Sequence, residues 1–309
     1  MDIEPISLTK SPTVAVVGMA TMDYLYLLDS HVKEDSENEV RKHYVGVGGP
    51  AGRGSITAAR LGGHVRVYAM CGTGLHADVL KQNMVAESLD CHFFEVDQDS
   101  QHSCCLLAAD TGTRTTIWIG QPSADERLLT VLDDAFRGAA AALLDCTDHI
   151  LTKTAIESCQ RQGIPIVIDT GSYKPYSEDF LNGVDYIVSP AKFFRRRHPD
   201  LSLEDAMART FADFGPKALV ATQAEAGGLY MDQTGLRSYD AAEVATVDSC
   251  GAGDTFHGAF AFAIAAGADL PLTLDIAAWA AASKCAVLGN DGIPHAADLT
   301  RHLAQRAAR

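Results

Sequence analysis

The chain has 309 residues, of which 47 % are apolar and 21 % are charged, a composition typical of a folded globular protein and not of a disordered or membrane-embedded one. Its formal net charge of −15 argues against nucleic acid as a partner, because binding a phosphate backbone requires a concentrated basic surface. Residues 1–12 do not have the pattern of a signal peptide and no stretch of about 18 apolar residues occurs, so we predict a cytoplasmic protein without a membrane span.

The first predicted element is a strand. Residues Thr13 to Gly18 form a nearly continuous β-branched run that ends in glycine, which is typical of a strand buried on both faces. Strand and helix patterns then alternate along most of the chain. We expect strands at residues 65–70, 140–145, 165–169, 184–189 and 218–222, and helices near residues 50–62, 76–88, 149–162, 202–213 and 251–266. This alternation predicts an α/β fold with a doubly wound, mainly parallel sheet flanked by helices, in a single domain over residues 1–309.

Two segments, within about residues 24–46 and 91–120, do not follow this alternation. Residues 39–45 alternate between polar and apolar side chains, and residues 103–109 and 115–119 flank a turn. These patterns predict half-exposed antiparallel strands outside the main sheet. We expect them to form a small β-sheet lid.

The stretch Val247 to Ala259 reads V-D-S-C-G-A-G-D-T-F-H-G-A and begins a long apolar helix. A helix that starts at a turn of small residues exposes unpaired N–H groups and the positive end of the helix dipole, which together favour a bound anion. Asp254 lies in the first turn, where a carboxylate can cap the helix or act as a base. The flanking glycines favour the base, because a cap does not need a turn that a ligand can approach closely.

The segment V-D-S-C-G-A-G-D-T-F resembles the C-terminal signature D-x-x-G-A-G-D-x-F of the ribokinase-like, or PfkB-type, carbohydrate kinases. The resemblance implies transfer of a phosphoryl group from ATP to a hydroxyl, expected to be primary, of a small sugar, with Mg²⁺ as the metal. It implies that the N–H groups of Gly251, Ala252 and Gly253 form the anion hole and that Asp254 removes the hydroxyl proton. Asp248 is the candidate ligand for a monovalent cation such as K⁺.

The N-terminal third of the chain carries the expected sugar contacts. Residues Gly18 to Asp23, G-M-A-T-M-D, resemble the family's G-x-x-x-x-D, in which the Asp hydrogen-bonds sugar hydroxyls. Gly48 and Gly49, with the helix that ends at Gly62, resemble the family's G-G-x-x-x-N and A-x-R-x-G, where the glycines let the sugar approach the backbone. Asp23, Gly48 and Gly49 are therefore candidate sugar-binding residues, together with Arg53.

Arg53 departs from the resemblance, because the family usually has Asn at this position. An amide that donates and accepts is thereby replaced by a cation that only donates. If the guanidinium points inward, a nearby carboxylate or an acidic group on the substrate must neutralise it. The alternative is that Arg53 reaches solvent or pairs with an acidic residue of the lid such as Glu37 or Glu39.

The expected nucleotide-binding residues lie in the C-terminal half. The segment T-Q-A-E-A-G, with Thr222, Gln223 and Gly227, resembles the family's nucleotide loop, and Ala281 to Cys285, on what we expect to be the last helix, resembles the wall of the adenine site. Lys192 stands where many members carry the Glu of N-x-x-E near magnesium and the phosphates. We keep Lys192 as a nucleotide-binding candidate, and Asp169, at the end of its strand, as the candidate magnesium ligand.

The substrate and the class of protein stay open to alternatives. T-M-D-Y-L-Y resembles sulfofructose kinases and G-N-D-G-I resembles ketohexokinases, which favours a ketose or a ketose derivative, but no arginine that would bind a sulfonate occurs at residues 145–147. A nucleoside kinase of the same family and a catalytically silent sugar-binding regulator are the rivals. A dinucleotide pattern at residues 46–51 is disfavoured, because it does not follow the first strand and lacks the downstream acidic residue. The resemblance also suggests a homodimer formed through the lid.

Eight cysteines occur without any C-x-x-C pair. We therefore expect neither a zinc site nor a disulfide framework, but reduced and mostly buried thiols. Their positions are 71, 91, 104, 105, 146, 159, 250 and 285.

Overall fold

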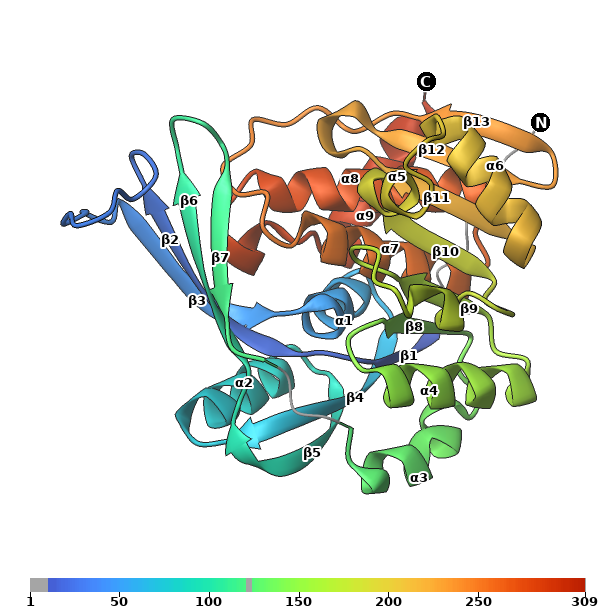
Figure 1. The fold of residues 1–309 in the computed structure, drawn as a ribbon, viewed down its shortest axis with the longest axis horizontal. Coiled ribbons are helices and arrows are strands. Elements are labelled where there is room, and N and C mark those ends of the chain that lie inside the picture. The colour runs from blue at the N-terminus through green and yellow to red at the C-terminus, as the bar shows by residue number, and fades with distance from the viewer. Residues whose placement is uncertain (1–10, 121–123, 309) are drawn as a thin grey trace.

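The computed structural model describes residues 11–120 and 124–308, so most of the N-terminal segment 1–12 lies outside the described residues. Nine strands form one large sheet (Figure 1). In spatial order these are β13 (Gly235–Tyr239), β12 (Gly228–Asp232), β11 (Ala218–Thr222), β10 (Tyr186–Pro190), β9 (Ile166–Asp169), β8 (Ala141–Asp145), β1 (Thr13–Val17), β4 (His64–Thr73) and β5 (Asp90–Asp99). The strands from β5 to β11 are parallel, and the hairpin β12–β13 adds two antiparallel strands at one edge.

Helices cover both faces of this sheet, and each face has its own hydrophobic core. The core on one face includes residues of α1 (Pro50–Arg60), α2 (Leu75–Ala86), α7 (Ala252–Ala265), α8 (Leu270–Cys285) and α9 (Ala296–Ala307). The core on the other face includes residues of α3 (Glu126–Phe136), α4 (His149–Gln162), α5 (Ala191–Arg197) and α6 (Leu203–Phe214). In β1, Val14 and Val16 belong to the first core, whereas Ala15 and Val17 belong to the second. The continuous apolar run predicted for a doubly buried strand is thereby explained.

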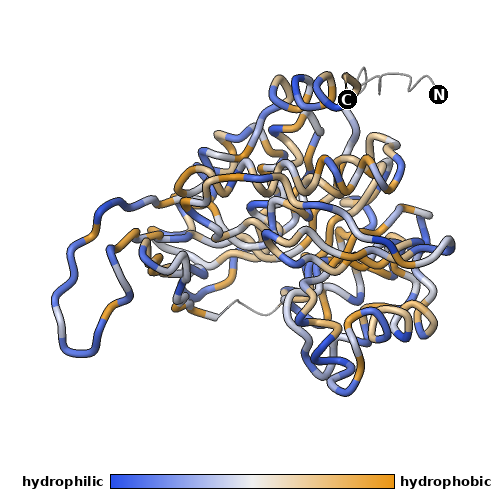
Figure 2. The backbone as a smooth tube through the Cα atoms, turned by 90° about the horizontal axis from the view of Figure 1, so that it is seen from above, coloured by the Kyte–Doolittle hydropathy of each residue, from blue (hydrophilic) through white to orange (hydrophobic). Residues whose placement is uncertain are grey.

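Four strands form a separate small sheet at one side of the large sheet (Figure 1). In spatial order they are β3 (Lys42–Gly48), β2 (Thr21–Leu28), β6 (His102–Ala108) and β7 (Arg114–Trp118). The loop at residues 29–41, between β2 and β3, extends away from the rest of the molecule and is mostly hydrophilic (Figures 1 and 2). The small sheet therefore has one end near the large sheet and the other in solvent.

The predicted doubly wound α/β fold with a separate small sheet is confirmed. Some boundaries differ. The strand expected at residues 39–45 begins only at Lys42, because the pairing of β3 with β2 ends there, opposite Leu27. The segment 90–99, which was expected to belong to the lid, is the edge strand β5 of the large sheet. An edge strand is half-exposed and has the same polar alternation as a lid strand, so the sequence pattern does not separate the two. The helix that holds Ala281 is not the last one, since α9 follows it.

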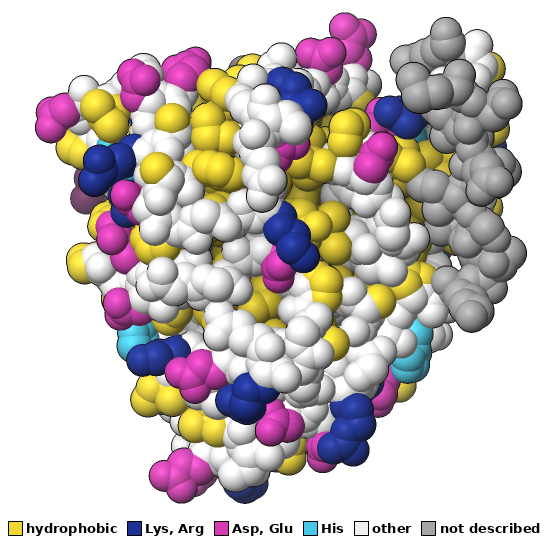
Figure 3. All heavy atoms as spheres, turned by 90° about the vertical axis from the view of Figure 1, so that its right-hand side faces the viewer, with side chains coloured by type: hydrophobic (Ala, Val, Ile, Leu, Met, Phe, Trp, Pro, Cys, Tyr) yellow, Lys and Arg dark blue, Asp and Glu magenta, His cyan; other side chains and the backbone are white. Residues whose placement is uncertain are grey.

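The surface and the helix lengths add two observations. Within the described residues, no helix has the length and apolar character needed to cross a membrane. On the face seen in Figure 3, acidic and basic side chains are intermingled and separated by small apolar patches.

Candidate active site

Segments that are far apart in the chain meet at the side chain of Arg53, which is 1 % exposed. Its Nη2 donates to Asp23 Oδ2 over 2.9 Å and its Nη1 donates to Asp254 Oδ2 over 2.8 Å. Its Nε donates to Asn290 Oδ1 over 2.9 Å. Arg53 lies in α1, Asp23 in β2 and Asp254 in the first turn of α7. The residues predicted to bind the sugar and to act as the base are therefore brought together around one buried cation.

The charge of Arg53 is matched by the two carboxylates. Burial alone would lower the pKa of Arg53, but Asp23 and Asp254 more than offset this and raise it above its ordinary value. Two carboxylates and one guanidinium leave the cluster with one net negative charge. The alternative that Arg53 reaches solvent or pairs with Glu37 or Glu39 is wrong, because the side chain points inward and both glutamates are exposed.

Glycines make room for the buried cation. A Cβ at Gly251 would collide with Nη1 of Arg53, and Gly251 also has a φ of +77°, which favours glycine. A Cβ at Gly258 would collide with the carbonyl oxygen of Gly54. Helices α1 and α7 therefore pack closely enough for Arg53 to reach Asp254.

Asp23 is held on both of its carboxylate oxygens. Oδ1 accepts a hydrogen bond from Ser103 Oγ over 2.8 Å, while Arg53 occupies Oδ2. A Cβ at Gly48 would collide with this carboxyl group, so the predicted sugar-contact glycine makes room for Asp23 itself. Gly49, directly before α1, has a φ of +79°, and a Cβ there would collide with the carbonyl oxygen of Met19. Both glycines thus have a structural reason that does not require a sugar.

The turn before α7 offers unpaired donors. Gly251 precedes the helix, and no acceptor among the described residues bonds the N–H groups of Gly251, Gly253 or Asp254. The N–H of Ala252 reaches only Ser249 O, at 3.4 Å. Such a helix start can bind an anion. The Asp254 side chain beside it is 21 % exposed, and its Oδ1 has no partner among the described residues.

A second buried ion pair lies just before this turn. Lys284 Nζ donates to Asp248 Oδ2 over 2.6 Å and to the Asp248 carbonyl oxygen over 2.9 Å. The N–H of Gly289 also donates to Oδ2, and the N–H of Cys250 donates to Oδ1. Burial lowers the pKa of Lys284, and Asp248 offsets only part of this effect. All three oxygens of the candidate cation ligand Asp248 therefore already have protein donors.

Two buried acids end neighbouring strands. Burial raises the pKa of Asp145 to about 6, although hydrogen bonds from Thr147 and Met19 lower it. Asp169 pairs with Asp145 across the β8–β9 register, and burial raises its pKa too, an effect that His257 partly offsets. Asp169 Oδ1 accepts from Gly171 N, and Oδ2 lies 3.4 Å from His257 Nδ1. The described residues contain no group of three or more acidic, His or Cys side chains that could hold a metal.

The predicted nucleotide-binding residues lie at the carboxyl ends of adjacent strands and on α8. Pro190 and Thr222 are paired and are the last residues of β10 and β11. Exposed Lys192 lies just past the end of β10, and Gln223 directly follows β11. Gly227 closes that loop, since its carbonyl accepts from Gln223 N. Ala281 and Cys285 lie one turn apart on α8, and the Cys285 carbonyl accepts from the N–H groups of residues 247 and 248. No hydrogen bond or ion pair among the described residues joins the two groups.

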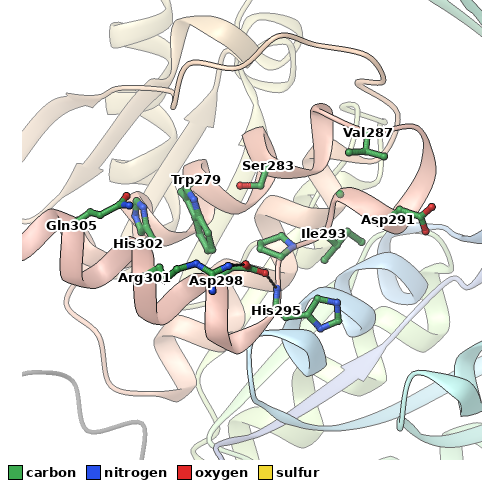
Figure 4. A pocket seen from close by; sticks show the side chains of 12 residues that line it. Trp279, Ser283, Val287, Asp291, Ile293, His295, Asp298, Arg301, His302 and Gln305 are labelled. Atoms are coloured by element: carbon green, nitrogen blue, oxygen red, sulfur yellow. Dashed lines mark hydrogen bonds and ion pairs between the residues drawn. The ribbon is translucent and has the colours of Figure 1, made fainter.

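A cleft of about 400 Å³ lies between α8 and α9, outside this region (Figure 4). Trp279 stacks on His302 with ring centroids 4.6 Å apart, and His302 pairs with Asp275 over 2.8 Å. None of the predicted site residues lines this cleft.

Sequence reasoning assigned no role to Asn290, Ser103 or Trp118. Asn290 Nδ2 also donates to Val47 O over 2.7 Å, so it fixes the Nε side of Arg53. The only signal was G-N-D-G-I, which we interpret above only as a resemblance to ketohexokinases.

Ser103 of β6 lies opposite Asp23 of β2 and opposite Trp118 of β7 in the strand register, so the three side chains share one face of the small sheet. Trp118 is 65 % exposed on that face.

Known proteins resemble this chain along most of its length. The family model described as pfkB family carbohydrate kinase matches residues 11–294. Ribokinase from Bacillus subtilis (strain 168) is 22 % identical over 291 residues, which cover 91 % of this chain and 96 % of the ribokinase. Ketohexokinase from Mus musculus is 23 % identical over 292 residues, which cover 91 % and 98 %. The structure of Arabidopsis thaliana ribokinase complexed with ribose and ATP superimposes with a TM-score of 0.79 at 20 % identity, over 95 % of this chain and 98 % of that one.

Proposed function

Since this chain belongs to the pfkB family of carbohydrate kinases, we propose that it transfers the γ-phosphoryl group of ATP to a hydroxyl of a small uncharged sugar. The observation that carries the proposal is the Asp254 carboxylate, half-buried beside the unpaired N–H groups at the start of α7. Phosphoryl transfer requires positioning, stabilisation of charge and an acceptor for the hydroxyl proton, and this one turn supplies groups for all three.

In this mechanism Asp254 is the base and Arg53 positions it. Arg53 binds Oδ2 and so fixes the position of the carboxylate, while Oδ1 stays available to accept the proton of the sugar hydroxyl. The N–H groups of residues 251–253 would stabilise the negative charge of the transferring group. Asp23 would accept hydrogen bonds from other sugar hydroxyls, since each carboxylate oxygen has more than one lone pair.

Magnesium fits this region only if the nucleotide supplies most of its ligands. Mg²⁺ commonly keeps several waters and binds one or two carboxylates together with the phosphates. Asp169 has one oxygen with a backbone partner and one that faces His257 at 3.4 Å, so it remains the candidate protein ligand. When bound, the ion would neutralise charge on the phosphate oxygens. The candidate nucleotide contacts remain the strand-end residues Thr222, Gln223, Gly227 and Lys192, together with Ala281 and Cys285 of α8.

The charge around Arg53 favours a neutral substrate. Two carboxylates already neutralise the guanidinium, so an acidic group on the sugar is not needed and would meet a net negative cluster. Three of the five N–H donors of Arg53 already have protein acceptors. With the ketohexokinase similarity, this supports an unmodified ketose phosphorylated at a primary hydroxyl.

The small sheet would act as a lid that excludes water, which competes with the sugar as acceptor. Its face opposite Asp23 carries Val45 and Ile117, which share that face with Tyr24 and are 41 % and 63 % exposed. Exposed apolar side chains on a protruding sheet favour a homodimer formed through the lid. A molar mass equal to that of one chain, 32.9 kDa, in light scattering would exclude it.

Replacing Asp254 by Asn should preserve the fold, because Asp23 still neutralises Arg53 and the Asn oxygen can still accept from its Nη1. The same change should lower kcat by roughly 10² to 10⁴, because the base is lost. The measurement is steady-state phosphorylation at saturating ATP and sugar. Asp269→Asn is the matched control, since Asp269 caps α8 through Leu272 N and lies outside the proposed site. If folded Asp254→Asn turns over about as fast as the wild type, Asp254 is not the base.

A substrate panel should rank uncharged ketoses above their phosphorylated or sulfonated forms, by about tenfold or more in kcat/KM, which is about 1.4 kcal/mol. The physical reason is the net negative charge around Arg53. The panel also includes ribose and nucleosides. If an anionic sugar has the highest kcat/KM and loses this lead in Arg53→Asn, Arg53 binds the anion. If nucleosides have the highest kcat/KM, the protein is a nucleoside kinase.

Potassium should not be required. A monovalent cation does not fit at Asp248, because the Lys284 ammonium already lies against its carboxylate and carbonyl oxygens. We expect kcat/KM and Tm to be the same in KCl and in NaCl at equal ionic strength. The comparison uses enzyme dialysed into a buffer without potassium. A rise in either quantity on adding potassium would overturn this expectation.

A further inference from the structure

Two cysteines meet where the small sheet contacts the rest of the molecule. Cys105 lies in β6, and Cys250 directly precedes Gly251 of the proposed anion hole. Their sulfur atoms are 3.6 Å apart, although the residues are 145 positions apart in the chain. The structure describes all eight cysteines, and among them this is the pair joined by a sulfur–sulfur hydrogen bond.

The two thiols belong to the apolar contact between the small sheet and the body. Leu25, Cys105 and Leu107 of the small sheet form one cluster with Cys250 and Leu288. Cys105 is 1 % exposed and Cys250 is 8 % exposed. A bond between these sulfurs would therefore join β6 directly to the segment that carries the catalytic turn.

The surroundings favour a thiolate at Cys105. A hydrogen bond from the Cys250 thiol lowers the pKa of Cys105 to about 6, and Thr116 Oγ1, at 3.2 Å, contributes in the same direction. The same hydrogen bond, together with burial, raises the pKa of Cys250. A low-pKa thiolate beside a second thiol is the arrangement of a redox-sensitive cysteine and its resolving partner. Because Cys105 is 1 % exposed, peroxide would reach it when the small sheet moves away from the body.

We propose that Cys105 and Cys250 form a reversible disulfide under peroxide, which fixes the small sheet against the turn before α7 and stops turnover. The sulfurs need to approach from 3.6 Å to about 2.05 Å, the length of a disulfide bond. With the sheet fixed, the lid motion that admits sugar and releases product is blocked. The effect on turnover rests on the proposed kinase function, whereas the disulfide itself does not.

The chemistry balances with hydrogen peroxide as the oxidant. The Cys105 thiolate attacks one peroxide oxygen, the O–O bond breaks, and sulfenic acid and hydroxide form. The Cys250 sulfur then attacks the Cys105 sulfur, the S–O bond breaks, and water leaves as the disulfide forms. Overall, two thiols and one peroxide give one disulfide and two waters. A dithiol such as dithiothreitol reverses the bond by exchange.

The test treats the full chain with a small excess of hydrogen peroxide and quenches it with catalase. Free thiols are counted after denaturation, linked peptides are mapped by mass spectrometry, and sugar phosphorylation is assayed in parallel. The variants are Cys105→Ser and, as the matched control, Cys104→Ser, which removes the adjacent thiol from the opposite face of β6. If Cys105→Ser does not fold, Cys105→Ala replaces it.

We expect the thiol count of the wild type to fall from eight to six, with Cys105 linked to Cys250. Activity should fall in proportion to the linked fraction and return with dithiothreitol. Cys104→Ser should behave in the same way, and Cys105→Ser should keep its activity under peroxide. An unchanged count of eight, or a linkage through Cys104, would overturn the disulfide. A mapped Cys105–Cys250 bond with undiminished phosphorylation would overturn the proposed loss of turnover. If no tested sugar is phosphorylated, the peptide map still decides whether the disulfide forms.

Discussion

The buried guanidinium of Arg53 is the interaction on which the rest of the site depends. An isolated cation with 1 % exposure is strongly unfavourable, so α1, β2 and α7 must each supply a partner or room for it. Asp23 and Asp254 supply charge, and Asn290 supplies the third acceptor. The small residues around the cation follow from the same constraint, because any side chain at Gly251 would collide with Arg53.

The same physical device occurs twice. Lys284 lies against Asp248 just before the turn that starts α7, as Arg53 lies against Asp254 just after it. In both places a protein cation supplies the positive charge that could otherwise come from an ion or from the substrate. Breaking such a buried pair exposes the partner's charge to an apolar environment, which ties the integrity of the fold to the integrity of the site. The site therefore has its charges largely matched without a ligand.

The sequence was sufficient for the fold class, and its motifs pointed to Asp23 and Asp254, which the structure brings together around Arg53. It did not predict the contacts between them. Periodicity predicted the parallel strands because both of their faces are buried, yet it did not separate edge strand β5 from a lid strand. Motif spacing predicted Asp23 and Asp254, whereas the direction of Arg53 depends on the close approach of α1 and α7 at Gly258, more than 200 residues away. The role of Lys284 was invisible for the same reason. Long-range neutralisation of charge requires the packing itself.

The central claim is that Arg53 couples to the carboxylates through charge and not through packing alone. The most direct test is a double-mutant cycle between Arg53→Met and Asp23→Asn, measured as the free energy of unfolding in urea. We expect the two substitutions together to cost about 1 to 3 kcal/mol less than the sum of the single costs, because Arg53→Met alone leaves the buried Asp23 carboxylate without its cation, and Asp23→Asn removes that charge in the double variant. Costs that add within about 0.5 kcal/mol would contradict it.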